Sequence, residues 1–180
     1  MKVAIILNFI PPYRLPLFKI LSTRVDQLRF YLSTQMEPNR SWSVDWGNLN
    51  IKLLKNFMFS YVWRHPKGFK EKLYIHIPLN IIQELKGFSP DVVISAEMGF
   101  RTMSVIFYKF LFPQTKVVLW ATISEYTEIG RDKARKILRS WILAHVDSVI
   151  VNGESGENYI KGFKFDAQKI FRSPYTADLN

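Results

Sequence analysis

Glutamate side chains on two polar stretches are the first candidates for chemistry in this sequence. Glu125 and Glu128 lie on one stretch, and Glu97 lies on another. A carboxylate can transfer a proton, or it can accept hydrogen bonds from the hydroxyl groups of a sugar. Two carboxylates that flank a glycosidic bond can also cleave it, but two glutamates on one short loop are poorly placed for that reaction. Glu125 and Glu97 are therefore the catalytic candidates, and Glu97 could instead simply complement a helix dipole.

An arginine and a glycine-containing turn are candidates for binding an anion. Arg14 lies beside the positive end of an expected helix, where a cation is unfavourable by about 0.3–1 kcal/mol and a bound anion would offset that cost. It could equally be a solvated loop arginine. The turn 152–155 has free N–H groups that can hold a phosphate or a sugar oxygen. It could also serve only as a helix cap, with Ser155 at the N-cap position.

Short apolar runs that end in polar loops are expected to position these residues. The runs are rich in branched side chains and predict strands over 2–8, 27–34, 91–95, 116–120 and 147–151. Helical spacing predicts helices over 16–23, 75–86, 101–112 and 131–145, and a short helix follows the 152–155 turn. The repeated order of strand, polar loop and helix indicates an α/β protein with a mostly parallel sheet, whose strand ends face a ligand.

The stretch 36–72 is the least regular part of the sequence and mixes aromatic with basic residues. Strands are predicted over 51–54 and 57–62, as a hairpin if they pair with each other. We expect most of the aromatic side chains to lie in the core. Alternatively, they could form a membrane-interface patch, stack on nucleic-acid bases or stack on sugar rings.

The predicted helix 131–145 has an apolar stripe and many basic residues. As a crossover helix it would cover the sheet with its stripe and leave its charges in solvent, and this packing is favoured over a helix that lies free on anionic lipid. Contact of its basic face with lipid remains compatible with that packing. The stripe consists of Ala134, Ile137, Leu138, Trp141 and Ile142.

Composition narrows the class of protein and of ligand. The 180 residues carry a formal net charge of +10, which suits nucleic acid, anionic lipid or a phosphorylated ligand, or only a soluble basic surface. The sequence has no cysteine and three scattered histidines, so no metal site is expected. It also lacks the G-x-G-x-x-G dinucleotide fingerprint, and no cofactor is expected. No signal peptide or membrane span is expected, which favours a soluble, cytoplasmic protein.

The order of these motifs resembles the N-terminal domain of GT-B glycosyltransferases of family 4. The run D-S-V-I-V-N-G-E-S-G-E-N-Y-I-K-G-F, followed by K-I-F-R-S-P-Y-T-A-D, is similar to the strand, short helix and proline-containing segment that end that domain. The beginning, I-L-N-F-I-P-P-Y-R-L-P-L-F, resembles members that act on surface polysaccharides and other bacterial glycans. P-D-V-V-I and V-V-L-W-A-T-I-S-E resemble middle strands, so the resemblance spans nearly all of the chain.

This resemblance implies a Rossmann-like, doubly wound sheet with helices on both faces, as the N-terminal half of a GT-B fold. Such an enzyme moves a sugar from a nucleotide-sugar donor to a glycan or lipid-linked acceptor, here in bacterial surface polysaccharide or related glycan synthesis. Residues 1–173 would form the acceptor-side domain, and 174–180 would begin the linker to a donor-binding domain that this chain lacks. By position, the residues lining the cleft would be Pro12, Tyr13, Arg14, Glu97, Trp120, Thr122, Ser124, Glu125, Asn152, Gly153, Glu154 and Ser155.

Three departures from the family pattern affect these expectations. Pro-Pro-Tyr-Arg replaces the paired glycines of the first loop, which argues against direct contact with the donor phosphates there. The histidine that often follows the fifth strand is missing, so Thr122, Ser124 or Glu125 would have to serve. The third departure is that this chain lacks the donor domain with its E-x7-E motif. Because that domain would stabilise the nucleotide leaving group, the chain is expected to be inactive alone.

Two other function classes compete with this interpretation. A basic nucleic-acid-binding module would fit the charge and the aromatic residues, but no nucleic-acid motif accompanies them, so no nucleic acid is expected as a partner. A non-catalytic carbohydrate- or partner-binding domain would fit a protein without a donor domain. A cytoplasmic protein is expected, and peripheral contact of its basic surface with anionic lipid would place it at the inner face of the membrane.

Overall fold

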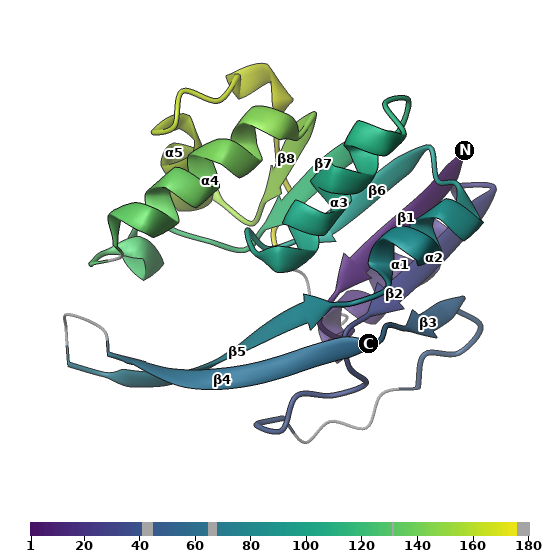
Figure 1. Cartoon of the computed structure of the whole chain (residues 1–180), viewed down its shortest axis with the longest axis horizontal. Helices are drawn as coiled ribbons and strands as arrows, with labels where there is room; N and C mark the ends of the chain where they lie inside the picture. The colour runs from purple at the N-terminus through teal and green to yellow at the C-terminus, as the bar shows by residue number, and fades with distance from the viewer. Residues whose placement is uncertain (41–44, 65–67, 131, 176–180) are drawn as a thin grey trace.

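A seven-stranded parallel sheet is the framework of the molecule (Figure 1). The computed structural model describes residues 1–40, 45–64, 68–130 and 132–175. The strand order is β3-β2-β1-β6-β7-β8-β9, and every neighbouring pair runs parallel. The strands are β1 Lys2–Leu7, β2 Gln27–Leu32, β3 Ile51–Leu53, β6 Val92–Ala96, β7 Lys116–Ala121, β8 Ser148–Val151 and β9 Ile170–Arg172.

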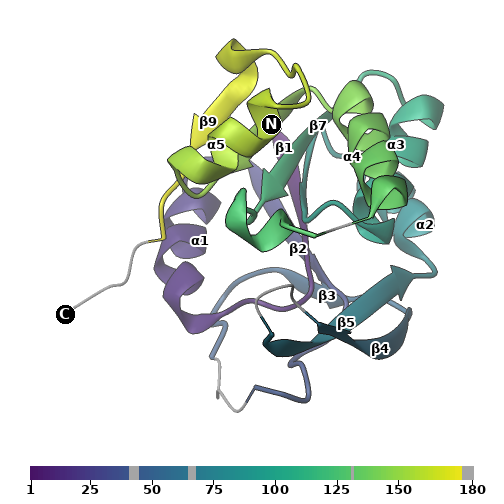
Figure 2. The ribbon, with the colours of Figure 1, turned by 90° about the vertical axis from the view of Figure 1, so that its left-hand side faces the viewer.

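Helices cover both faces of this sheet, which confirms the predicted Rossmann-like α/β architecture (Figure 2). Phe18 of α1 (Leu15–Ser22) packs in the core of one face. The other face packs against α2 (Ile81–Phe88), α3 (Phe100–Leu111), α4 (Lys133–His145) and α5 (Glu154–Lys161). Strand β1 lies inside the sheet, between β2 and β6, and Ile5 and Ile6 on its two sides are fully buried. A strand covered on both faces needs such a continuous apolar run, which explains why it was predictable.

A long hairpin stands apart from the sheet and corrects two predictions. It consists of β4 (Asn56–Arg64) and β5 (Lys70–Pro78), which pair antiparallel with Met58 opposite His76. The predicted strand 51–54 does not pair with 57–62, because β3 instead extends the parallel sheet beside β2. The predicted helix 75–86 is also wrong in its first half, because residues up to Pro78 belong to β5 and α2 begins at Ile81.

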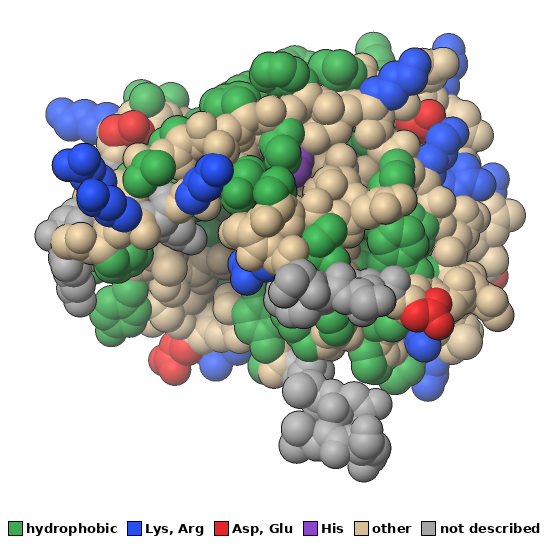
Figure 3. Space-filling model, turned by 90° about the horizontal axis from the view of Figure 1, so that it is seen from below, with side chains coloured by type: hydrophobic (Ala, Val, Ile, Leu, Met, Phe, Trp, Pro, Cys, Tyr) green, Lys and Arg blue, Asp and Glu red, His purple; other side chains and the backbone are tan. Residues whose placement is uncertain are grey.

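Aromatic side chains of the hairpin lie open to solvent, contrary to the expectation that they are core residues. Phe57, Phe59 and Phe69 are all exposed. The underside of the molecule accordingly shows hydrophobic side chains interspersed with lysine and arginine (Figure 3). A two-stranded ribbon offers little cover to its own side chains, so aromatic composition alone did not indicate burial. Residues 41–44 and 65–67 of this stretch lie outside the described residues.

Helix α4 packs as a crossover helix, but two of its residues differ from the predicted pattern. Ile142 and Leu143 are buried against the sheet, whereas Ile137 of the predicted apolar stripe is 70% exposed. Arg139, expected in solvent, is buried and forms an ion pair with Glu128. Helix α4 begins at Lys133, and residue 131 of the predicted range lies outside the described part. Among the described residues, no helix has the length and apolar character that crossing a membrane requires.

Asp147 fastens α3 to the sheet. Its Oδ2 accepts hydrogen bonds of 2.7 Å from Lys109 Nζ and from the Val117 N–H. Partial burial would raise the pKa of Asp147, but these hydrogen bonds and the charges of Lys109 and Lys116 lower it below its ordinary value overall. A carboxyl whose pKa is lowered by folding stabilises the protein above its unfolded pKa of about 3.9, and this contribution is lost as the pH falls through the folded pKa.

We therefore expect Asp147→Asn to lower the free energy of unfolding at pH 7 by about 1–2 kcal/mol. Its stability should then fall less steeply than that of the unsubstituted protein as the pH drops below about 4. Urea denaturation at several pH values measures both effects. Glu154→Gln is the control: it removes an exposed carboxylate from the first turn of α5 and should lower the free energy of unfolding by less than about 1 kcal/mol. If the stability of Asp147→Asn falls with pH as steeply as that of the unsubstituted chain, Asp147 is not the source of the acid sensitivity.

Candidate functional site

The loops with the candidate residues all leave the sheet at one edge. Because the seven strands are parallel, their carboxyl ends meet there. The strand order reverses between β1 and β6, and ligands of open α/β sheets bind beside such a switch point. The polar loops after β1, β6, β7 and β8 therefore lie at the edge where a ligand is expected.

A cleft of about 780 Å³ opens at this edge, between the strand ends and the β4–β5 hairpin. Its floor includes Asn8 after β1, Glu97 after β6 and Thr122 after β7. Its walls come from the hairpin and from the first turns of α3 and α4. Two of the twelve predicted cleft residues, Glu97 and Thr122, lie in its lining. The volume suits one or two sugar rings or a nucleotide.

A glutamate and a buried arginine form the most distinctive pair in the cleft. Arg101 Nη2 lies 3.0 Å from Glu97 Oε2. The Arg101 side chain is 6% exposed, whereas the Glu97 side chain is 55% exposed. Burial lowers the pKa of Arg101, and the charges of Glu97 and Glu37 oppose that shift. The arginine therefore holds one carboxylate oxygen from beneath and leaves the rest of the carboxylate facing the cleft.

The backbone at Glu97 is strained. Its φ of 68° lies in the left-handed region, which costs a residue with a Cβ roughly 1–2 kcal/mol. The Glu97 N–H donates to the Trp120 carbonyl at 3.0 Å, and Thr102 Oγ1 donates to the Glu97 carbonyl. Strain of this kind persists where the surroundings fix it, and it is concentrated at functional sites. From this fixed backbone the exposed Glu97 side chain lines the cleft.

A second polar group joins the hairpin to the strand ends. Glu37 Oε1 accepts a hydrogen bond of 2.9 Å from Asn8 Nδ2 and lies 3.4 Å from His76 Nε2. The other ring nitrogen, His76 Nδ1, lies 2.9 Å from Asn56 Nδ2. Both nitrogens of His76 therefore face protein groups, and Glu37 and His76 are buried. This cluster holds the hairpin over the cleft rather than presenting a free base to a ligand.

The opposite side of the cleft carries aromatic and basic side chains. Arg135 of α4 donates from Nη2 to the Tyr61 hydroxyl of the hairpin at 3.1 Å. On β5, Lys72 Nζ lies 5.5 Å from the centroid of the Tyr74 ring. All four residues line the cleft. Tyrosine rings with neighbouring charged donors can contact both the apolar face and the hydroxyl groups of a sugar.

A smaller hollow collects three other predicted residues. Tyr13, Arg14 and Trp120 line it together with Tyr175. Arg14 is not a solvated loop arginine: it is buried, with its guanidinium carbon 4.3 Å from the Trp120 ring centroid and Nη2 3.4 Å from the Tyr175 hydroxyl. Burial and the adjacent Tyr175 raise the pKa of Tyr13. Five of the twelve predicted cleft residues are thus divided between two hollows of the same edge.

The remaining predicted residues line neither hollow. Ser124 and Thr127 hydrogen bond within the loop after β7, and the Glu125 N–H donates to Ser155 Oγ at 3.1 Å. Ser155 is therefore not the N-cap of α5, since Gly153 takes that position and Ser155 lies in the first turn. Its hydroxyl instead connects two loops of the edge. Pro12, Asn152, Gly153 and Glu154 also lie outside both linings.

Several important side chains escaped the sequence prediction. The sequence predicted Arg101 only as the first residue of a helix, and His76 only as a residue within one. A signal for His76 existed: Leu73, Ile75 and Ile77 place an aliphatic side chain at every second position, with His76 between two of them, which is typical of a strand. In the part of the chain that the structure describes, no three His, Asp or Glu side chains converge as metal ligands would.

Comparisons with known proteins support the fold. No protein-family model matches the sequence, and no curated protein shows significant similarity to it. Among solved structures, Anabaena HepE in complex with UDP superposes with a TM-score of 0.62 at 10% identity, covering 99% of this chain and 45% of that one. The same protein with UDP and glucose gives the same values.

A second group of solved structures is similar to a lesser degree. UDP-GlcNAc 2-epimerase from Neisseria meningitidis superposes with a TM-score of 0.54 at 12% identity, covering 97% of this chain and 47% of that one. The chain thus spans less than half the length of these proteins. At such low identity the likeness establishes architecture alone. The chain has the Rossmann-like architecture of one half of a GT-B fold.

Proposed function

We propose that this chain is the acceptor-side domain of a glycosyltransferase that takes a sugar from a nucleotide-sugar donor. The observation that carries the proposal is Glu97: a carboxylate on a strained backbone, held by buried Arg101 and open to the cleft. Such a carboxylate suits hydrogen bonding to acceptor hydroxyl groups or accepting a proton from one of them. The fold likeness to a protein solved with UDP and glucose adds support.

In this proposal the acceptor is a glycan or a lipid-linked sugar of bacterial surface polysaccharide or a related glycan. It lies in the cleft over Asn8, Glu97 and Thr122, with Tyr61 and Tyr74 beside it. The nucleotide of the donor binds mainly to a second domain, which the linker beginning at 174 would join to residues 1–173. The linker lies mostly outside the described residues. A single domain then supplies half of the machinery and is inactive alone, and its place of work is the cytoplasm.

The proposal is tested by NMR titration of the 15N-labelled chain with UDP and with a panel of methyl glycosides that includes glucose. Sugar binding in the cleft, and weaker or no binding of UDP, supports an acceptor-side domain. Tight UDP binding with no sugar binding contradicts the division of roles. Binding of sugar by the chain, together with a full-length gene product that does not use nucleotide sugars, would favour a non-catalytic carbohydrate-binding domain instead.

A further inference from the structure

Large hydrophobic side chains lie open along the outer surface of α3 and α4. Phe110 is 53% exposed, Leu111 65% and Ile137 70%, and Phe107 is also exposed. With the half-buried Trp141 these residues form what we call the α3–α4 surface. Contiguous exposed hydrophobic residues on one face indicate an interaction site rather than the scattered exposure that is normal for proteins.

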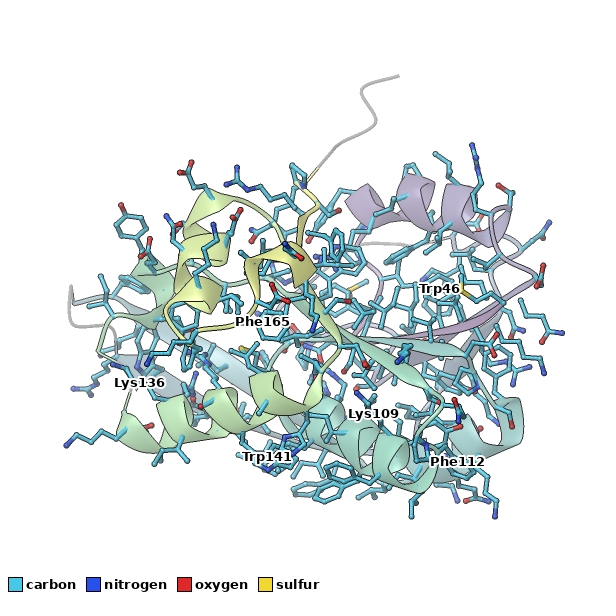
Figure 4. All side chains as sticks on the ribbon, turned by 90° about the horizontal axis from the view of Figure 1, so that it is seen from above. Trp46, Lys109, Phe112, Lys136, Trp141 and Phe165 are labelled. Atoms are coloured by element: carbon cyan, nitrogen blue, oxygen red, sulfur yellow. The ribbon has the colours of Figure 1, made fainter. Side chains whose placement is uncertain are left out.

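The aromatic members of this surface contact one another. The Phe107 ring lies 6.2 Å from the Phe110 ring and 6.0 Å from the Trp141 ring, measured between centroids. His145 continues the row, with 4.7 Å to Trp141 and 5.3 Å to Phe110. Figure 4 shows Trp141 on the outer side of α4, where this helix runs beside α3. The surface is therefore formed before any partner binds.

The charged side chains of the two helices are all basic, and the acidic neighbours Asp132 and Asp147 lie at the two ends of α4. The 12 residues of α3 and the 13 residues of α4 contain no Asp or Glu. Lys133 and Lys136 of α4 are exposed, and Lys133, Ile137 and Trp141 follow at the four-residue spacing that places them on one side of a helix. A partner must therefore combine an apolar layer with negative charge. Two copies of the chain would bring these positive surfaces together and repel each other.

From this combination we infer that the α3–α4 surface docks on an anionic lipid bilayer. Aromatic side chains favour the headgroup level, and each basic residue near an anionic surface adds attraction to it. The inference goes beyond the proposed function, because it concerns where the domain lies and not what it transfers. Helix α4 also contributes Ala134 and Arg135 to the cleft, which its N-cap Asp132 lines as well. A docked α4 therefore holds one end of the cleft next to the membrane surface.

Vesicle sedimentation of the chain tests this inference. We expect binding to vesicles of an equimolar mixture of phosphatidylglycerol and phosphatidylcholine, and little binding to phosphatidylcholine alone. The double variant Lys133→Gln/Ile137→Ser should bind the anionic vesicles about 10- to 30-fold more weakly, because it removes one charge and one exposed apolar side chain. Brominated lipid should quench tryptophan fluorescence, and Trp141→Phe should remove most of that quenching.

The matched control is Lys19→Gln/Ile20→Ser on α1, which makes the same two changes on the opposite face of the sheet. Ile20 is 59% exposed and Lys19 is exposed, so both double variants change only surface positions. The control should bind vesicles like the unsubstituted chain. Equal loss in both variants, equal binding to neutral vesicles, or a dimer in light scattering that the α4 variant alone dissociates would overturn the inference.

Discussion

Glu97→Gln is expected to lower the transfer efficiency, kcat/KM, of the full-length protein about 10- to 100-fold, which is the value of a hydrogen bond to a charged group. The substitution keeps the shape of the side chain and the left-handed backbone, and it removes the charge that faces the cleft. Arg101 remains beneath the new amide and can still donate to its oxygen. We expect the circular dichroism spectrum of this variant to match that of the unsubstituted protein while its activity is reduced.

Glu125→Gln is the matched control for this experiment. Glu125 was the other catalytic candidate, but it lines neither hollow. Its N–H, which the substitution leaves in place, makes the contact to Ser155. We expect kcat/KM of this variant to change by less than about threefold, since surface changes away from a site have small effects. Loss of activity in Glu125→Gln with full activity in Glu97→Gln would move the site to the loop after β7.

Gly156→Ala is expected to lower the free energy of unfolding by about 2–3 kcal/mol, because the added methyl group has no room. A Cβ at Gly156 would lie 2.8 Å from the Ile123 carbonyl oxygen and 3.2 Å from Val151 Cβ. The first of these is a backbone atom and cannot turn away. Since Ile123 also lines the cleft, moving it should disturb the site as well. Thermal and urea unfolding measure the change.

Gly87→Ala provides the comparison. Gly87 lies in α2, and a Cβ there would meet no atom within 4 Å. Alanine favours a helix over glycine, so this variant should be more stable than the unsubstituted chain by about 0.5–1 kcal/mol. The same substitution, glycine to alanine, should therefore lower the free energy of unfolding at position 156 and raise it at position 87. A Gly156→Ala variant as stable as the unsubstituted chain would show that α5 does not rest on the loop after β7.

Much of the fold was predictable because it is encoded locally. The strands β7 and β8 differ by a residue or so from the predicted ranges, since each is an uninterrupted apolar run between turn signals. The hairpin was missed because residues 75–86 contain both an alternating and a helical pattern, and only pairing with β4 decides between them. Partners 20 residues away in sequence cannot be identified from the local pattern of either strand.

The candidate site was predictable only in part for the same reason. Glu97 was identified because it follows a buried run at the edge of a parallel sheet. Its partner Arg101 was not, because its surroundings include residues distant in sequence, such as Ser33, 68 residues earlier, to which it donates a hydrogen bond. Glu37 and His76 meet across 39 residues. The division of Arg14 and Glu97 between two hollows likewise follows from side-chain packing, not from the order of the motifs.

The most direct test of the acceptor cleft is to identify which residues' amide signals shift when a sugar binds the 15N-labelled chain. An acceptor cleft predicts shifts that cluster at Asn8, at residues 97–101, at Thr122 and at residues 72–76 of the hairpin, and that disappear in Glu97→Gln. Shifts confined to the Tyr13–Tyr175 hollow or to the outer helices, or no shift with any sugar of the panel, would contradict the account.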